Sequence, residues 1–161
     1  MRVLPLSDDG LPDWRVEKSA LTGKKNGHQV IFAGRIRNFT SSNVFSEVYG
    51  VHWTAGALIG LPYYYHCVKK QIKNLVKLVR PDIIHSHNIG SAKISRDLGL
   101  PFVFDDHEYF KILSNVNDEN NRFNNVSKQI SLPRKVIRDA KLNFVISQSM
   151  IKWTKWEEEL V

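Results

Sequence analysis

Short apolar segments of strand length alternate with longer segments of helical period along most of the chain. Apolar runs without strict alternation are typical of strands that are buried on both faces of a parallel sheet. Strands separated by helices in this order favour an α/β fold with helices on both faces of the sheet. We expect strands at Val3–Leu6, Gln29–Gly34, Val44–Trp53, Asp82–His87, Pro101–Asp106 and Leu142–Ser147, and helices at Trp14–Asn26, Tyr63–Val79, Ile89–Leu98, Leu132–Ala140 and Met150–Leu160.

The size of the chain suits a single Rossmann-like domain over residues 1–161, because chains of this length can bury most of their unfolded surface. The N-terminus has no signal-peptide features, and the longest near-apolar run, Thr54–Tyr65, is shorter than the ~20 residues that a membrane span needs. The single cysteine, Cys67, excludes an internal disulfide framework. These features predict a cytoplasmic protein.

The positive charge of the chain is unevenly placed. The formal net charge is +7, and all of the excess lies in residues 1–80. This asymmetry favours an anionic partner, although lysines on a helix can also be a solvated face. Nothing in the sequence resembles a nucleic-acid-binding motif, so we expect contact with an anionic membrane surface or with the acceptor of a reaction. The lysines concerned share one predicted helix: Lys69, Lys70, Lys73 and Lys77.

Polar and charged residues gather where the predicted strands end. Ligands of parallel α/β sheets bind in the crevice at the carboxyl ends of the strands, so these groups are expected to meet at one edge. The candidates for substrate binding are Asp8, Asp9, Gly10, His87, Asn88, Ser147 and Ser149, and the candidates for catalysis are Asp106, His107 and Glu108. His85 and His87 alternate on one strand and therefore share a face of the sheet. We expect His85 to be a buried structural residue.

The segments RPDIIHSHN, GLPFVFDDHEYF and AKLNFVISQSM, in this order and spacing, resemble the N-terminal lobe of family 4 glycosyltransferases. The segment VEKSALTGKKNGHQVIFAG resembles the first helix and second strand of that lobe. The resemblance covers nearly the whole chain and implies the acceptor-side lobe of a two-lobed, GT-B type enzyme. It also implies that the donor-binding C-terminal lobe is absent, so that this chain alone is inactive.

The resemblance implies a function for particular residues. His107 takes the place of a histidine that contacts the transferred sugar, with Asp106 and Glu108 beside it. The turn after the first strand departs from the glycine-rich pattern of the family, because Asp8 and Asp9 would repel a diphosphate. They are expected to accept hydrogen bonds from sugar hydroxyls instead. The implied reaction moves a hexosyl group, with retention, from a nucleotide sugar, which is a co-substrate, to a glycan or lipid-linked acceptor at the inner face of the membrane. No other cofactor is expected.

Two other interpretations remain open. His85-x-His87 followed by Asp105, Asp106, His107 and Glu108 offers enough nitrogen and oxygen ligands for a metal-dependent hydrolase. Against a metal site, adjacent residues of a strand point to opposite faces, so Asp105 and Asp106 cannot both reach one ion. The second alternative is a non-catalytic module that binds a membrane surface. We expect no metal.

Overall fold

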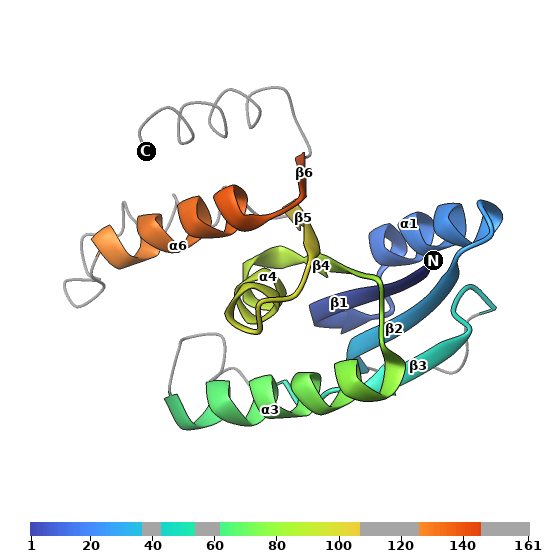
Figure 1. The fold of residues 1–161 in the computed structure, drawn as a ribbon, viewed down its shortest axis with the longest axis horizontal. Coiled ribbons are helices and arrows are strands. Elements are labelled where there is room, and N and C mark those ends of the chain that lie inside the picture. The colour runs from blue at the N-terminus through green and yellow to red at the C-terminus, as the bar shows by residue number, and fades with distance from the viewer. Residues whose placement is uncertain (37–42, 54–61, 107–125, 146–161) are drawn as a thin grey trace.

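The computed structural model describes residues 1–36, 43–53, 62–106 and 126–145, and for 126–131 it describes the backbone alone. These residues form a sheet of six parallel strands with helices on both faces (Figure 1), which confirms the predicted fold class. In chain order the elements are β1 (Arg2–Leu11), α1 (Trp14–Lys25), β2 (Gln29–Ile36), β3 (Glu47–Gly50), α3 (Pro62–Val79), β4 (Ile83–His87), α4 (Asn88–Asp97), β5 (Phe102–Asp106), α6 (Val126–Asp139) and β6 (Leu142–Val145).

The strand order in the sheet is β3-β2-β1-β4-β5-β6. From β1 the chain moves outward to β2 and β3, then returns past β1 through α3 to build β4, β5 and β6 on the other side. Parallel strands are joined by right-handed crossovers. Connections that run in opposite directions along the sheet therefore lie on opposite faces, and Figure 1 shows α1 and α3 on the two sides of β1 and β2.

The face of the sheet under α1 has a small core. Asp13 caps this helix, since its side-chain oxygen accepts hydrogen bonds from the backbone N–H groups of Arg15 and Val16. Val16 and Ala20 then face the sheet and pack against apolar side chains from β1, β2 and the segment before β3. The sheet contributes Leu11, Val30 and Phe32 to this core, and the segment before β3 contributes Phe45.

The opposite face carries the larger core. Helix α3 buries Val68, Ile72 and Val79, as their helical spacing predicts. These side chains join apolar residues of α4, α6 and strands β1, β2, β4 and β5 in one cluster. The sheet contributes Leu4, Leu6, Ile31, Ala33, Ile84, Phe102 and Phe104.

Several predicted bounds differ from the structure. Strand β1 continues to Leu11, well beyond the predicted end at Leu6. Strand β3 is shorter than expected, and α6 begins at Val126 and contains Pro133 in its interior. The predicted helix Met150–Leu160 lies outside the described residues.

A polar cluster joins α3 to α4 beside the larger core. The carboxylate of Asp97 accepts hydrogen bonds from the Tyr65 hydroxyl and from Lys93, whose Nζ lies 2.6 Å from Oδ2. The same Lys93 Nζ lies 3.7 Å from the centre of the Tyr65 ring, a cation–π distance. Burial raises the pKa of Asp97. The hydrogen bonds from Lys93 and Tyr65 and the charges of Lys93 and Lys69 together lower it by more, so the pKa lies below its usual value.

Asp97→Asn should destabilise the fold by about 1 kcal/mol at pH 7, because it removes a partly exposed ion pair and weakens two hydrogen bonds. A carboxyl group with a lowered folded-state pKa stabilises the fold above its ordinary pKa of about 3.9, and this contribution is lost as the pH falls through the lower value. The difference in urea unfolding free energy between the two proteins should therefore shrink below about pH 4. A difference that stayed constant into acid would contradict this assignment.

Candidate functional site

The carboxyl end of β1 is a bulged strand rather than the predicted turn. Ser7 pairs with Gly34 and Leu11 with Ile36, so the segment between them on β1 holds more residues than its partner on β2. The extra length arches out of the ladder, and the N–H of Gly10 donates to Ser7 Oγ at 3.1 Å to close the arch. The prediction that Asp8, Asp9 and Gly10 follow the strand is corrected here, because pairing with the long strand β2 continues beyond them.

Gly10 holds this bulge in place. Its φ of +81° lies in the left-handed region, which favours glycine. A Cβ at this position would stand 1.9 Å from the backbone carbonyl oxygen of Arg35. A glycine is therefore required by packing as well as by backbone conformation, and this structural role needs no ligand.

Asp9 and Asn88 are brought together across the edge of the sheet. The Asn88 Nδ2 donates to Asp9 Oδ2 at 2.6 Å, which joins the bulge of β1 to the first residue of α4. Asn88 is 6% exposed and has a φ of +69°, a conformation that asparagine adopts more readily than most residues. Its Oδ1 is buried and has no hydrogen-bond partner within the described part of the chain. This oxygen is an acceptor suited to a ligand hydroxyl or N–H group.

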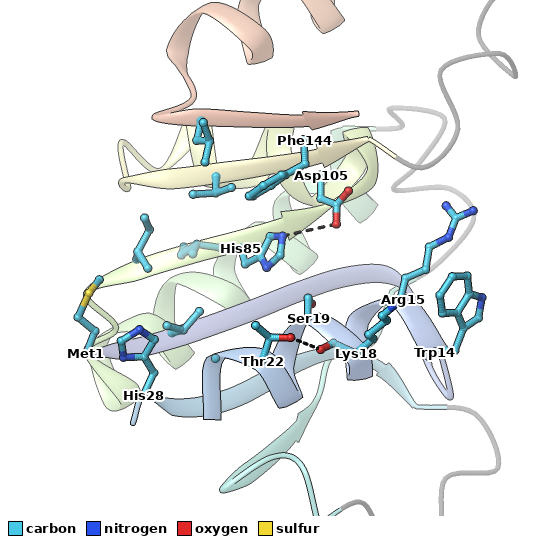
Figure 2. A pocket seen from close by; sticks show the side chains of 16 residues that line it. Met1, Trp14, Arg15, Lys18, Ser19, Thr22, His28, His85, Asp105 and Phe144 are labelled. Carbon is cyan, nitrogen blue, oxygen red and sulfur yellow. Dashed lines mark hydrogen bonds and ion pairs between the residues drawn. The ribbon is translucent and has the colours of Figure 1, made fainter. Parts of the chain in front are cut away.

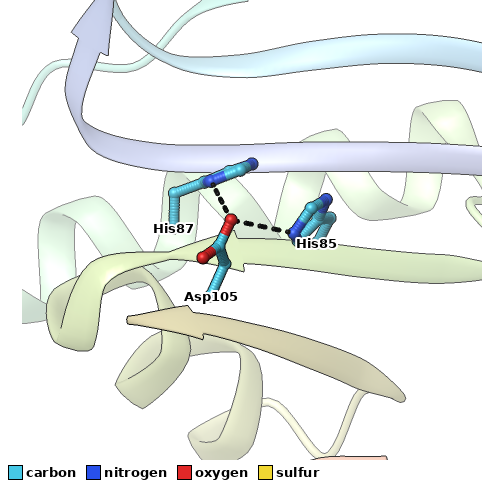
Figure 3. A group of neighbouring side chains, drawn as sticks. All are labelled: His85, His87 and Asp105. Carbon is cyan, nitrogen blue, oxygen red and sulfur yellow. Dashed lines mark ion pairs between the residues drawn. The ribbon is translucent and has the colours of Figure 1, made fainter. Parts of the chain in front are cut away.

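His85 and His87 lie on the same face of β4, as the alternation of the strand predicts. Their ring centroids are 4.2 Å apart, and both rings face the carboxylate of Asp105 on β5 (Figure 3). Asp105 Oδ2 lies 3.6 Å from His85 Nε2 and 3.5 Å from His87 Nδ1. The parallel pairing of His87 with Asp105 sets this arrangement.

The exposure of the two histidines differs from what we expected. His87 was predicted to reach a ligand, yet it is fully buried. His85 was predicted to be buried, but it lines an open groove. This groove has a volume of about 930 Å³ and lies between α1 and the face of β4, β5 and β6. Figure 2 shows the side chains of Trp14, Arg15 and Lys18 at one side of it and His85, Asp105 and Phe144 at the other.

The remaining predicted site residues divide into two groups. Asp8 and Asp106 are buried, each 7% exposed. Asp106 follows the alternation of β5, which places it on the face opposite Asp105, as predicted. The other predicted residues lie outside the described part of the chain: His107, Glu108, Ser147 and Ser149. Their contact with a ligand stays a prediction.

The lysines of α3 lie away from the groove. Lys70, Lys73 and Lys77 are exposed, while Lys69 is half-buried at the edge of the helix that faces the sheet. At 100° per residue the exposed lysines form one stripe. Tyr63 and Leu78 are also exposed on this helix, at 74% and 69%.

A comparison with models of protein families found no match, and a comparison with curated proteins found none either. The fold is nevertheless shared with several solved structures. Sucrose-phosphate synthase from Thermosynechococcus elongatus superposes with a TM-score of 0.73 at 12% identity, covering 97% of this chain and 45% of that protein. A glycosyltransferase from Streptomyces sp. SF2575 superposes with a TM-score of 0.53 at 12% identity, covering 93% and 51%.

The chain has the fold of a GT-B glycosyltransferase lobe. It spans about half the length or less of these solved structures. The UDP-GlcNAc 2-epimerase from Methanocaldococcus jannaschii has the same fold, with a TM-score of 0.55 at 10% identity, covering 100% of this chain and 43% of that protein. The GT-B lobe fold therefore serves more than one reaction, and the chemistry depends on the residues of the site.

Gly10→Ala should destabilise the protein by more than about 3 kcal/mol, because the added methyl group meets the Arg35 carbonyl and the residue must keep a positive φ. Gly27→Ala is the matched control, since Gly27 has a φ of +76° but nothing within 4 Å of an added Cβ. It should lose only about 1 kcal/mol. Urea unfolding of the three proteins measures both values, and equal losses would show that the close approach at Gly10 is unimportant.

Proposed function

We propose that this chain is the acceptor-side lobe of a retaining glycosyltransferase, which moves a sugar from a nucleotide-sugar donor to a glycan or lipid-linked acceptor. The proposal is supported by the GT-B lobe fold together with the polar edge at the carboxyl ends of β1 and β4. The single observation that carries it is the Asp9–Asn88 pair, which leaves a buried amide oxygen without a protein partner among the described residues.

The Asp9–Asn88 pair suits the recognition of a sugar hydroxyl. The carboxylate of Asp9 accepts from the Asn88 NH₂ group, which fixes the orientation of the amide and directs its oxygen to another donor. A site that has a buried acceptor discriminates strongly against ligands without the matching hydroxyl, because the acceptor is then left unpaired. The negative charges of Asp8 and Asp9 disfavour a diphosphate here, so this edge fits the acceptor or the sugar ring.

The reaction itself requires groups that stabilise developing charge. Glycosyl transfer passes through an oxocarbenium-like state while negative charge grows on the departing diphosphate. In this proposal His107 donates a hydrogen bond to the transferred sugar, Asp106 orients His107, and Glu108 accepts from the acceptor hydroxyl. Ser147 and Ser149 contact the donor side. The diphosphate is held by a second, C-terminal lobe.

Residues 1–161 alone should release no measurable nucleoside diphosphate from UDP-, GDP- or ADP-sugars, since in this proposal they form only the acceptor-side lobe. In the two-lobed protein, His107→Ala and Asn88→Gly should each lower kcat/KM at least tenfold, which corresponds to ~1.4 kcal/mol of transition-state stabilisation. Glycine is chosen at position 88 because it keeps the positive φ without strain.

Two exposed residues provide controls for these substitutions. His52→Ala and Asn74→Ala replace a histidine and an asparagine on the surface and should leave kcat/KM unchanged. Robust sugar transfer by the isolated chain would refute the proposal that a second lobe is needed to bind the donor. Wild-type kcat/KM in both His107→Ala and Asn88→Gly would refute the proposed site.

We further propose that the exposed stripe of α3 holds the protein reversibly at an anionic membrane surface on the cytoplasmic side. None of the helices in the described part of the chain is long and apolar enough to cross a membrane. The exposed lysines would meet lipid phosphates, and exposed Tyr63 at the start of the same helix suits the interface between headgroups and acyl chains.

Replacing Lys70, Lys73 and Lys77 together by glutamine should abolish co-sedimentation with phosphatidylserine vesicles at low salt, because each basic residue near an anionic surface contributes ~1 kcal/mol. Lys69 is kept, since its charge acts on Asp97. The matched control replaces Lys18, Lys24 and Lys25 of α1 by glutamine, which removes the same charge from another helix. Equal sedimentation of the two triple variants would refute a specific role for α3.

A further inference from the structure

We propose that His85, His87 and Asp105 form a binding site for a divalent transition-metal ion, with zinc as the best fit, at the wall of the groove. One donor atom from each of these side chains lies within 4.8 Å of the others. The histidines come from alternate positions of β4 and the carboxylate from the neighbouring position on β5 (Figure 3). The site depends only on these neighbouring strands and is independent of sugar transfer.

The distances in this cluster are long for hydrogen bonds. An N–H···O bond has its heavy atoms about 2.7–3.2 Å apart, whereas Asp105 Oδ2 lies 3.6 Å and 3.5 Å from the two histidine nitrogens. His85 Nε2 is buried and makes no hydrogen bond within the described residues. Neither contact of Asp105 Oδ2 with a histidine ring is therefore a direct hydrogen bond.

The same distances match the spacing of ligands around a small ion. Zinc binds histidine nitrogen and carboxylate oxygen at about 2.0–2.1 Å in a tetrahedron, so two ligand atoms stand about 3.3–3.4 Å apart. The two separations from Asp105 Oδ2 are within a few tenths of an ångström of that value, and the three donor atoms all lie within 4.8 Å of one another. A small adjustment of side chains already on one face would complete three of the four coordination positions, with His85 bound through Nε2 and His87 through Nδ1.

The ligand types select the class of metal. Two imidazoles and one carboxylate suit zinc and its first-row neighbours, whereas magnesium and calcium prefer oxygen ligands throughout. His87 is fully buried and Asp105 lies in a strand within the sheet, which gives the rigid support that a metal site needs. Asp105 and Asp106 cannot both reach one ion from adjacent positions of a strand, but this cluster uses Asp105 alone.

The fourth coordination position would open to the groove. His85 and Asp105 both line it, and Arg15 and Lys18 of α1 stand across from them (Figure 2). Zinc sites with three protein ligands and one open position bind water or a ligand group there. The cationic side chains across the groove favour an anionic group, such as a carboxylate or phosphate, as that fourth ligand.

The test is calorimetric titration of the untagged chain with zinc, in a Cys67→Ser background because this exposed thiol could bind metal on its own. We expect one equivalent to bind, with Asp105→Asn and His85→Gln each weakening the affinity at least about 100-fold, since loss of even an outer partner of a metal ligand costs 10–100-fold. His52→Ala, an exposed histidine elsewhere, should bind zinc as tightly as the parent. Magnesium in excess should not compete.

The coordinating atoms can be read directly. In ¹⁵N spectra of the histidine rings, zinc should shift Nε2 of His85 and Nδ1 of His87, and the cobalt form should show the strong visible absorption of a tetrahedral site. Circular dichroism of each variant checks that it is folded, and His85→Gln retains the test if Asp105→Asn does not fold. No binding by the parent, unchanged affinity in a folded His85→Gln or Asp105→Asn variant, or equal loss in His52→Ala would overturn the site.

Discussion

Parallel pairing is the constraint from which the rest of this structure follows. A parallel strand has to return along a crossover before it can pair again, and the hand of that crossover decides which face receives each helix. Because β2 and β4 lie on opposite sides of β1, α1 lies on one face, while α3, α4 and α6 lie on the other. No described helix covers β4, β5 and β6 on the α1 side, and the groove is found there.

Strand β4 shows how one strand serves both faces. Ile84 packs in the larger core, and Ser86 on the same side bonds the hydroxyl of Ser95 of α4 at 2.8 Å. This buried polar pair satisfies both hydroxyls inside an apolar layer. The alternate residues, His85 and His87, meet a carboxylate on the other face. The alternation of side chains along a strand thus places the residues that stabilise the fold on one face and those that are available for chemistry on the other.

The fold class was predictable because each strand is a compact apolar run and each helix has its own period. The shared face of His85 and His87 was also predictable, since it needs only the alternation of one strand. The relation of Asp105 to these histidines was not, because it depends on the register between β4 and β5, which no local pattern contains. The full burial of His87 beside the partly exposed His85 was not predictable either. Burial depends on which helix covers each face.

The end of β1 is another instance where pairing overrides local preference. Asp8, Asp9 and Gly10 have the composition of a turn, yet they form a bulge within β1, because pairing with the long strand β2 resumes at Leu11. The contact of Tyr65 with the Lys93–Asp97 pair was equally hidden, because Tyr65 is far from Asp97 in sequence and meets it only when α3 packs beside α4.

The bulge in β1 allows residues at the edge of the sheet to vary independently of residues in the core. Between Ser7 and Leu11 the extra residues arch out, and pairing with β2 resumes at Leu11 and Ile36 with a shifted register. Substitutions or small insertions within the arch, Gly10 apart, can therefore alter the groups presented at the edge of the sheet without shifting the register of Leu4 and Leu6 in the core. The chemistry of this corner, aspartates included, is thus separable from the packing of the core around the central strand.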